Sequence, residues 1–379
     1  MSMYSMARPD EPTPEPQYYY DIDGLLTIES AVRLPELAFF RVLKAKNPDL
    51  VIEIKGPRRP HLRTFAMIHP PAARLRYREQ VGDLGANFDI YIGTPIHVVV
   101  TRLLAFSPHV LYTNIIEALL RFILLSKDHM LLHAACLGLD GQGVLLSAKT
   151  DTGKTSTLLR LLQDDANGVF YSDDMTIINA DGIAQRYPKP LTISKHTVSA
   201  LQIDRLTRKQ RAALAIQSRL HSRSGRTVGK RIAQSPLPIM AINSIVQAAI
   251  PPPKYMVTDL IDTRIGDKTS IDRLFVIARG EPLAETLDHG EIVEQLLENT
   301  EDAYGFPPYQ QLAPLISVGG VSNDVLRLRE REILTAAMSN VPCERITLPD
   351  FSWPTVVRDR LTRAMEVRGV DTAKVAYAV

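Results

Sequence analysis

The chain has 379 residues, 45% of them hydrophobic and 23% charged, and a formal net charge of +2. The length predicts two or three domains, and the composition excludes a wholly disordered or collagen-like chain. The two cysteines, Cys136 and Cys343, are too few for a secreted disulfide framework or a four-thiolate zinc site.

The N-terminal end and the hydropathy bear on where the protein resides. Residues 1–17 contain four prolines and three acids without an apolar run, which predicts a flexible tail and not a signal peptide. The most apolar stretches, Ile96–Phe106 and Ile115–Leu125, are interrupted by charged residues and fall short of a membrane span. We therefore expect no transmembrane segment and a cytoplasmic protein.

Short apolar runs typical of strands follow the tail, separated by glycine and proline. They lie at Tyr18–Ile22, Leu26–Ile28, Leu50–Ile54, Thr64–Ile68 and Phe88–Ile92. Asn114–Leu125 then has the spacing of an amphipathic helix with one broad apolar face. We expect a β-rich N-terminal domain over residues 18–126.

The middle of the chain alternates strand-like and helix-like segments. The predicted strands are Met130–Leu139, Gly143–Ser147, Val169–Tyr171 and Leu274–Ala278, and the predicted helix is about Lys154–Gln163. Asp140-Gly141, between the first two runs, is a pair typical of a hairpin turn. We assign residues 127–300 to a core domain. Residues 301–379 are expected to be mainly helical, with helices at about Asn323–Ser339 and Pro354–Arg368.

The charge is unevenly distributed. Between Arg205 and Arg231 there are nine lysines and arginines and no acid, so the rest of the chain carries a net charge of −7. Such a stretch is either a solvated basic helix and loop or a surface that attracts a phosphate, an acidic partner or an anionic surface. It contains no aromatic residue to stack on bases, so we expect no specific nucleic-acid binding.

Residues 148–155 differ from the phosphate-loop pattern G-x-x-x-x-G-K-[ST] only at their first position, Ala148. In that pattern, backbone N–H groups and the following helix N-terminus hold polyphosphate oxygens. The lysine, here Lys154, reaches the β- and γ-phosphates, and the hydroxyl of Thr155 ligates Mg²⁺. The expected nucleotide-binding residues are Thr150, Asp151, Thr152, Gly153, Lys154, Thr155 and Ser156. The alternative is an ordinary β–turn–α connection.

Two adjacent acids, Asp173 and Asp174, follow the strand Val169–Tyr171. Adjacent side chains of an extended strand point to opposite faces, so a turn at Asp173 is needed to bring both carboxylates into one site. A pair of acids beside a phosphate loop suits one Mg²⁺ ligand and one base that accepts a proton from a substrate hydroxyl. The alternative is an Asx turn or a helix cap without a metal.

His133 lies in the first predicted strand of the hairpin, on the neighbour of the strand that leads into the phosphate loop. It is either a core histidine with its hydrogen bonds satisfied or part of the site.

Taken together, the runs Leu132–Cys136 and Gly143–Ser147, the loop end Thr152–Thr155 and Ser172–Asp174 resemble the core of the HPr kinase and phosphoenolpyruvate carboxykinase superfamily. Within it, the chain is most similar to HPr-kinase-related proteins of the actinobacterial and archaeal type. The resemblance implies an α/β fold: a P-loop phosphotransferase core with a mixed sheet. A β-rich N-terminal domain would precede this core and a mainly helical region would follow it.

The resemblance also implies roles for individual residues. ATP and Mg²⁺ would be the cofactors, with Asp174 ligating the metal, Asp173 acting as general base, Lys154 holding phosphate and His133 lying near the transferred phosphate. The family also places basic residues near the γ-phosphate, and the candidates here are Lys189, Lys195, Arg223, Arg226, Lys230 and Arg279. The Glu-(Ile/Leu)-Arg-Gly signature of true HPr kinases is absent, so we do not expect the protein HPr as the substrate. The oxaloacetate-handling part of carboxykinases is not recognisable either.

Three functions remain open at this point. The favoured one is an ATP-dependent phosphotransferase that moves the γ-phosphoryl group to a hydroxyl of a peptide, protein or small molecule. The second is a nucleotide-gated regulatory NTPase without an acceptor, and the third is a nucleic-acid binder. A pure switch needs a metal-binding acid but no acceptor base, so the second aspartate favours the phosphotransferase. The sequence identifies neither the acceptor nor the oligomeric state, and a homo-oligomer stays open.

Overall fold

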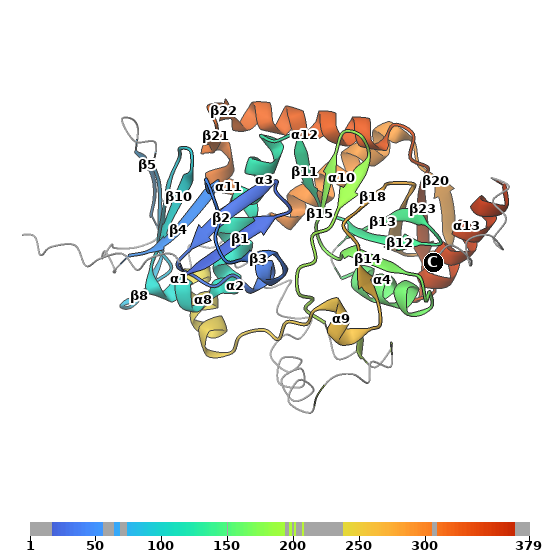
Figure 1. The fold of residues 1–379 in the computed structure, drawn as a ribbon, viewed down its shortest axis with the longest axis horizontal. Coiled ribbons are helices and arrows are strands. Elements are labelled where there is room, and N and C mark those ends of the chain that lie inside the picture. The colour runs from blue at the N-terminus through green and yellow to red at the C-terminus, as the bar shows by residue number, and fades with distance from the viewer. Residues whose placement is uncertain are drawn as a thin grey trace, which may run out of the picture.

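The structure is a computed structural model that describes residues 17–55, 64–68, 74–149, 151–193, 197–198, 201, 207, 238–304 and 309–367. Within these residues the chain forms mixed sheets covered by helices, which confirms the predicted α/β class (Figure 1). An N-terminal sheet lies on one side of the molecule and the sheet that leads into the candidate phosphate loop lies on the other. The domain boundaries proposed from the sequence stay predictions.

The N-terminal sheet has eight strands in the order β3-β1-β2-β4-β10-β9-β6-β5. Their bounds are β1 (Tyr18–Ile22), β2 (Leu26–Ser30), β3 (Arg41–Val42), β4 (Leu50–Ile54), β5 (Thr64–Ile68), β6 (Arg74–Arg78), β9 (Phe88–Tyr91) and β10 (Ile96–Val100). The short elements η1 (Pro35–Phe40), β7 (Gln80–Val81) and β8 (Leu84–Gly85) lie between them. The β-rich character expected for this segment is confirmed.

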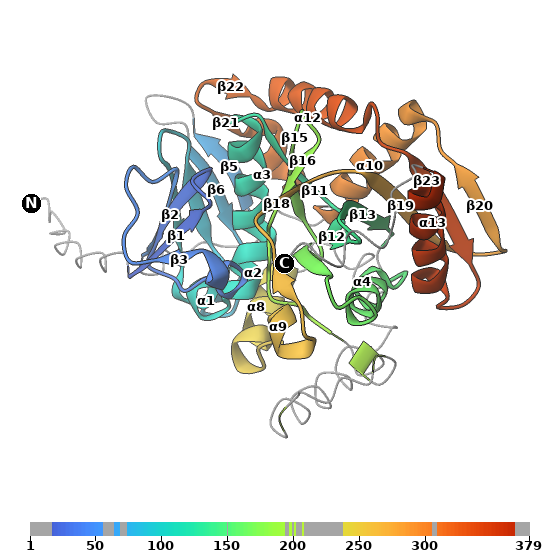
Figure 2. The same cartoon turned by 45° about the vertical axis from the view of Figure 1, so that its right-hand side comes forward.

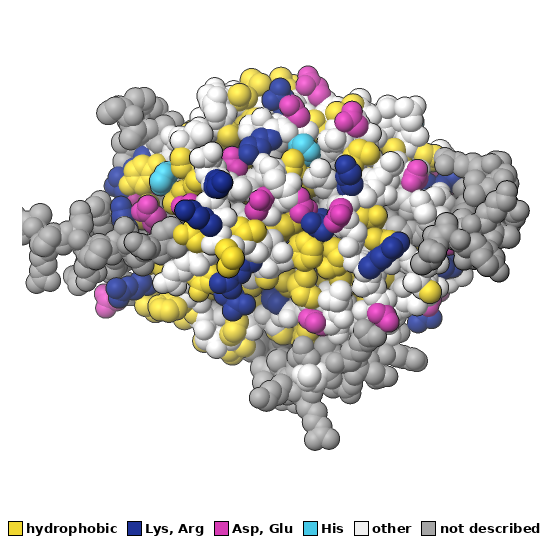
Figure 3. Space-filling view, in the orientation of Figure 1, with side chains coloured by type: hydrophobic (Ala, Val, Ile, Leu, Met, Phe, Trp, Pro, Cys, Tyr) yellow, Lys and Arg dark blue, Asp and Glu magenta, His cyan; other side chains and the backbone are white. Residues whose placement is uncertain are grey.

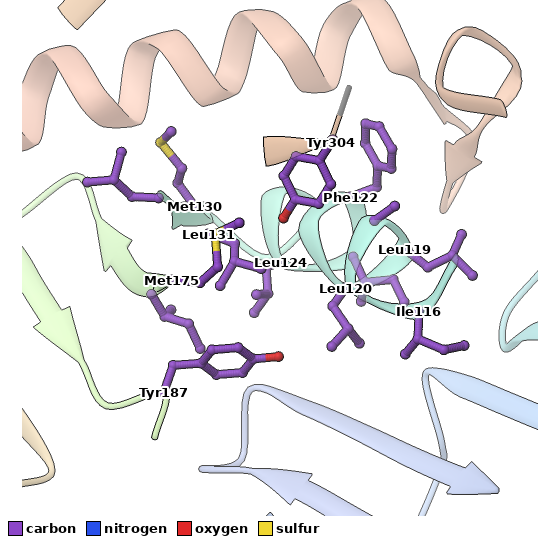
Figure 4. Close-up of a cluster of buried hydrophobic side chains, with 14 of the residues drawn as sticks. Ile116, Leu119, Leu120, Phe122, Leu124, Met130, Leu131, Met175, Tyr187 and Tyr304 are labelled. Atoms are coloured by element: carbon purple, nitrogen blue, oxygen red, sulfur yellow. The ribbon is translucent and has the colours of Figure 1, made fainter. Parts of the chain in front are cut away.

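A helical segment between the two sheets forms the centre of the molecule (Figure 2). It comprises α1 (Arg102–Phe106), α2 (Pro108–Leu111), the π-helical η2 (Tyr112–Ile116) and α3 (Glu117–Leu125). Every residue of α3 is buried, so the polar face expected of an amphipathic helix is not exposed. Figure 4 shows apolar side chains of α3 packed against those of the following strand and against Tyr187 and Tyr304. The stretch Pro108–Leu125 is apolar and long enough to cross a membrane, but 78% of it is buried inside the protein.

The second large sheet has seven strands in the order β17-β14-β12-β13-β19-β23-β20. Their bounds are β12 (Ala135–Leu139), β13 (Gln142–Ala148), β14 (Val169–Ser172), β17 (Arg264–Ile265), β19 (Arg273–Arg279), β20 (Leu283–Thr286) and β23 (Cys343–Leu348). Strand β12 is antiparallel to both β13 and β14, so β13 and β14 run in the same direction. The C-terminal ends of β13 and β14 therefore lie at the same end of the sheet as the N-terminal end of β12.

The predicted hairpin is confirmed. Asp140 and Gly141 both have positive φ, at 50° and 75°, and join β12 directly to β13. Two successive positive φ values match the twist of the flanking strands, and a glycine at the second position adopts one without steric cost.

The apolar run Met130–Leu139 is not the single strand that was predicted. It divides into β11 (His129–Leu132) and β12, with a break at His133 and Ala134. Strand β11 pairs with β15 (Thr176–Asn179) in a separate sheet that also contains β16 (Ile183–Gln185) and β18 (Lys268–Ser270). Both halves of the run are buried, each in its own sheet, so hydropathy does not mark the break.

Helices cover both faces of the seven-stranded sheet. Alternate residues of one strand enter different hydrophobic clusters: Leu137 belongs to the cluster that includes side chains of α4 (Lys154–Gln163) and α13 (Trp353–Val367), whereas Cys136 belongs to the cluster that includes side chains of α10 (His289–Ala303). A sheet covered on both faces needs apolar residues at nearly every position, and this explains the unbroken apolar run through β12. Helices α8 (Ile239–Ala249) and α9 (Val257–Leu260) lie between β16 and β17 in the chain.

The described part of the C-terminal region is mainly helical, as predicted, but it also contains strands. Its elements are α11 (Tyr309–Leu312), η3 (Ala313–Leu315), β21 (Ser317–Val318), β22 (Val321–Ser322), α12 (Asn323–Met338), β23 and α13. The two long helices agree with the prediction, but β23 enters the core sheet between β19 and β20. Glu344 and Arg345 interrupt its apolar pattern, and both form ion pairs with neighbouring elements.

Charged side chains of both signs are interspersed with apolar ones on the face drawn in Figure 3. No single-sign field covers the described part of that face, which agrees with a formal net charge of only +2. The basic stretch predicted at Arg205–Arg231 falls almost wholly outside the described residues.

Helix α3 carries a fully buried arginine. The guanidinium of Arg121 donates to both carboxylate oxygens of Glu330 on α12 at 2.8 Å, to Glu301 at 3.2 Å and to the Tyr309 hydroxyl at 2.9 Å. Its charge also lies 4.7 Å from the centre of the Tyr304 ring. Burial disfavours the cation, but the facing carboxylate and hydroxyls raise the pKa of Arg121 above its usual value. This cluster joins α3 to α10 and α12.

We predict that Arg121→Met destabilises the protein by about 3 kcal/mol, because the buried Glu330 carboxylate would keep only the partly exposed Arg327 as its cationic partner. Urea unfolding followed by circular dichroism measures this difference. Replacing both residues, Arg121→Met with Glu330→Leu, should recover most of the loss. Arg331→Met is the control, because it removes an exposed pair with Glu294 and should leave the unfolding midpoint nearly unchanged. Equal effects of Arg121→Met and Arg331→Met would contradict the assignment.

Candidate functional site

Three segments meet at one end of the seven-stranded sheet. They are the loop after β13, the turn after β14 and the break that precedes β12. The loop leads into α4, the turn contains Asp173 and Asp174, and the break contains His133. Topology therefore brings together the candidate residues that the sequence had placed on separate strands.

The loop between β13 and α4 is tightly turned. Asp151 has a φ of 66° and Gly153 a φ of 125°. Thr152 is buried and bonds to the Lys149 carbonyl through both its amide and its hydroxyl. A Cβ at Gly153 would lie 3.4 Å from the Phe351 ring in addition to the unfavourable φ, so this position requires glycine. Strand, glycine turn and helix follow one another as a phosphate loop requires.

Two predicted loop residues add less to this picture. Thr150 lies outside the described residues. The Ser156 hydroxyl donates to the Thr197 hydroxyl at 3.2 Å, away from the acidic pair.

The first acid, Asp173, contacts the phosphate-loop threonine. The Thr155 hydroxyl donates to Asp173 Oδ2 at 2.9 Å. The other carboxylate oxygen, Oδ1, is buried and accepts no hydrogen bond from the described residues. Burial raises the pKa of Asp173 to about 6; Lys154 lowers it and the Asp174 charge adds to the rise. A buried carboxylate with a free oxygen is suited to accept a proton or a ligand.

The second acid, Asp174, is surrounded by cations. Its Oδ1 lies 3.3 Å from His133 Nε2 and 3.7 Å from Lys154 Nζ, and its Oδ2 lies 3.1 Å from Lys189 Nζ. Partial burial favours the neutral acid, but Lys189, His133 and Lys154 together hold the pKa of Asp174 well below its usual range. Asp174 is therefore ionised over the physiological range.

Lys154, the first residue of α4, points at the acidic turn. Its ammonium donates to the Asp174 carbonyl at 3.3 Å, and its side chain is only 11% exposed. Burial lowers the pKa of Lys154, and the two aspartates oppose that shift. The lysine is thus held at the end of the loop by the carbonyl and the carboxylate of Asp174.

His133 lies in the break between β11 and β12, and not in a strand as predicted. Helix α10 orients its ring, because Nδ1 donates to the Asn299 carbonyl at 2.9 Å. The other ring nitrogen, Nε2, therefore points towards Asp174. Its amide donates to the Thr300 hydroxyl at 3.2 Å. The Asn299 carbonyl can only accept, so Nδ1 is the ring nitrogen that donates to it. Sequence reasoning missed Asn299 and Thr300, since nothing in the pattern of α10 marks them.

Lys189 joins the site to the central helix. Its ammonium donates to Glu117 of α3 at 2.5 Å as well as to Asp174, and it lies 5.9 Å from the centre of the Tyr112 ring. Burial disfavours the cation, but Glu117 and Asp174 raise the pKa of Lys189 above its usual value. The sequence indicated Lys189 only as one of six basic candidates, and Glu117 only as a break in an apolar run.

The other basic candidates are less closely placed. Arg279, at the end of β19, lies 5.1 Å from the centre of the Trp353 ring, and Trp353 also contacts the position of Gly153. Lys195, Arg223, Arg226 and Lys230 fall outside the described residues.

The donor set suits a hard divalent cation. The Thr155 hydroxyl and the carboxylates of Asp173 and Asp174 are oxygen ligands, and the orphaned Asp173 Oδ1 is a free donor among them. Mg²⁺ typically takes one or two carboxylates with substrate phosphates, without a cage made only of protein. Among the described residues no group of three His, Cys, Asp or Glu side chains forms such a cage. The residues therefore fit Mg²⁺ bound together with a polyphosphate.

No protein-family model matches the chain, and no curated protein matches it. Among solved structures, the Hpr(Ser) kinase/phosphatase from Coxiella burnetii aligns over 64% of this chain and 99% of its own, at 10% identity and a TM-score of 0.27. A likeness this low carries no argument about function.

We predict that the Asp173 carboxyl titrates near pH 6 in the free protein, because burial favours its neutral form. Isotope-edited infrared spectroscopy of the carboxyl band measures the midpoint. Asp174→Asn should lower this pKa by removing a neighbouring negative charge, and Lys154→Met should raise it by removing a positive one. The exposed acid Asp267 supplies a control, because Asp267→Asn should leave the midpoint unchanged. Shifts in the opposite directions would contradict the geometry described for the pair.

Proposed function

We propose that the protein is an ATP-dependent phosphotransferase that moves the γ-phosphoryl group to a hydroxyl of a protein, peptide or small-molecule acceptor. One observation carries the proposal. At one end of a sheet, the threonine and lysine that end the proposed phosphate loop face two aspartates. The pKa of one aspartate is raised and the pKa of the other is lowered. An ordinary β–turn–α connection has no need of such a pair.

In this proposal the loop and α4 bind the polyphosphate. Amides of residues 151–155 and the helix N-terminus face the β- and γ-phosphates, and Lys154 moves from Asp174 to the phosphate oxygens. Thr155 and Asp174 would hold Mg²⁺, which would supply positive charge beside the transferred group. The contact between Thr155 and Asp173 also brings the first aspartate close to that metal position.

Asp173 is proposed as the general base. It accepts the proton of the acceptor hydroxyl while the acceptor oxygen bonds to the γ-phosphorus and the bond to the ADP oxygen breaks. A pKa near 6 keeps most of the carboxylate ionised at neutral pH and close enough to the operating pH for efficient proton transfer. The free Oδ1 is the atom proposed to take the proton.

His133 and Lys189 are proposed to hold Asp174 in place and to offer positive charge beside the transferred group. Each also forms a hydrogen bond to a second partner that orients it: His133 donates to the Asn299 carbonyl and Lys189 donates to Glu117. Such fixed charges need little reorganisation during the reaction, and this is the main way a protein favours phosphoryl transfer.

We predict that Lys154→Ala weakens ATP binding by about tenfold or more, because it removes the cation directed at the phosphates. Calorimetric titration with the non-hydrolysable analogue AMP-PNP and Mg²⁺ measures the affinity. Lys268→Ala, which removes an exposed lysine from β18, is the matched control. Unchanged affinity in a folded Lys154→Ala protein would overturn the phosphate-loop assignment.

We predict that the two aspartates separate by role. Asp173→Asn should keep Mg²⁺–ATP binding and lose transfer by about a hundredfold or more, whereas Asp174→Asn should raise the Mg²⁺ requirement and lower all turnover. Transfer of labelled γ-phosphate from ATP into a lysate of the source organism measures the activity and reveals the acceptor. Asp173→Asn protein provides the unlabelled reference.

The same experiment distinguishes the alternatives. If both variants lose Mg²⁺ affinity equally, Asp173 is a metal ligand and not the base. If ATP is hydrolysed and inorganic phosphate is the only labelled product, the nucleotide-gated NTPase is favoured over the transferase.

A further inference from the structure

A ladder of arginines projects from the N-terminal sheet, away from the candidate site. In β6 the sequence alternates Arg74, Leu75, Arg76, Tyr77 and Arg78. Leu75 and Tyr77 belong to the hydrophobic core, so the three arginines occupy the other face of the strand. Three like charges on neighbouring positions repel one another, so such a ladder requires negative charge nearby.

One acid of the neighbouring strand faces all three. Asp89 of β9 lies opposite Arg76 in the antiparallel register. Its carboxylate forms an ion pair with Arg74 and lies 2.6 Å from Arg78 Nη2 and 3.5 Å from Arg76 Nε. Arg78 is held further by the carbonyls of Tyr77 and Phe88, and it is only 6% exposed. A single carboxylate does not neutralise three guanidinium groups.

Beside this cluster lies a pocket of about 60 Å³. Its polar lining includes Lys55, Arg74, Arg78, Asn87 and Asp89, with the Tyr91 ring forming part of the wall. This volume exceeds what a single water molecule needs and suits a small oxyanion. The Nε atom of Arg74 is buried without a hydrogen-bond partner among the described residues, although Arg74 also stacks on Tyr91. A donor left over in this way is available to a ligand.

Charge counting identifies the class of ligand. Lys55 lies 4.0 Å from Glu53, so among the described residues of this region four cations face two carboxylates, and two of these positive charges have no carboxylate to compensate them. A carboxylate ligand would neutralise one of them. A phosphate monoester carries about −1.5 to −2 at neutral pH and would neutralise both. Arginine forks bind phosphate through paired N–H donors, which favours the same ligand.

The pocket is separate from the phosphate loop. Strands β6, β9 and β10 belong to the sheet on one side of the central helix, and the loop belongs to the sheet on the other (Figures 1 and 2). A group bound there does not reach Asp173.

We propose that the pocket beside Arg74, Arg78 and Asp89 binds the phosphate group of a small phosphorylated molecule, as a second anion site independent of the phosphate loop. The inference does not rest on the proposed function, because it follows from the arginine ladder alone. Binding would add a counter-charge between Arg74 and Lys55 and relieve the repulsion along β6.

The test uses the full-length Lys154→Ala protein, in which the phosphate loop is weakened. Calorimetry measures binding of inorganic phosphate, of glycerol 3-phosphate as a monoester and of acetate as a carboxylate. We expect saturable binding of one or both phosphates and none of acetate at the same concentrations. Tighter binding of the monoester identifies a phosphorylated metabolite as the ligand, and tighter binding of inorganic phosphate identifies the free ion. No saturable phosphate binding, or equal binding of acetate, would overturn the proposal.

Matched variants then locate the site. Adding Arg74→Gln should weaken phosphate binding by about tenfold or more, because it removes a guanidinium group that lines the pocket and can donate two hydrogen bonds to phosphate. Adding Arg76→Gln removes the same charge from the same strand without removing a lining residue, and should have a much smaller effect. Equal losses in the two variants would mean general charge attraction and would reject the pocket. If Arg74→Gln fails to fold, tungstate soaked into crystals of the Lys154→Ala protein decides, because an anomalous peak beside Arg74 is required.

Discussion

The arrangement of the candidate site depends on the contacts that the Asp174 carboxylate makes with three basic side chains. Its oxygens lie within 4 Å of three nitrogen atoms: His133 Nε2 before β12, Lys154 Nζ at the start of α4 and Lys189 Nζ after β16. These three segments are far apart in the sequence and share no backbone ladder at this point. One partly exposed carboxylate therefore fixes their ends relative to one another, and a nucleotide that draws Lys154 away would leave two cations in place.

The charges continue from this carboxylate into the centre of the molecule. Lys189 bonds to Glu117, and Arg121 follows Glu117 by four residues, which places both on one side of α3. Arg121 in turn bonds to Glu330 of α12. Burying such groups is costly unless each has a partner, so this line of pairs demands an accurate fit between α3, α12 and the turn after β14. The apolar cluster in Figure 4 surrounds the same helix and supplies the burial that these pairs require.

The sequence predicts the parts of the fold that depend on local signals. Asp140-Gly141, the glycine before Lys154 and the apolar run of β14 are short patterns with a direct backbone consequence, and each lies where expected. The break at His133 could not be predicted, because the residues on either side are equally apolar and only the partner strands differ. Neither could the burial of Glu117, since its partner Lys189 is distant in sequence. The candidate acids and lysine were found from their pattern, whereas their supports, Asn299 and Glu117, depend on tertiary packing.

Two adjacent aspartates acquire different chemistry because the turn after β14 sends them to different surroundings. Asp173 is half-buried with its Oδ1 enclosed, and the Thr155 hydroxyl donates a hydrogen bond to its Oδ2. Asp174 turns towards three cations and remains partly exposed. Burial without a strong donor favours the protonated form, whereas surrounding positive charge favours the ionised form, so the two pKa values move apart. A separation of this kind between neighbouring acids favours different tasks for them, proton acceptance for Asp173 and fixed negative charge for Asp174.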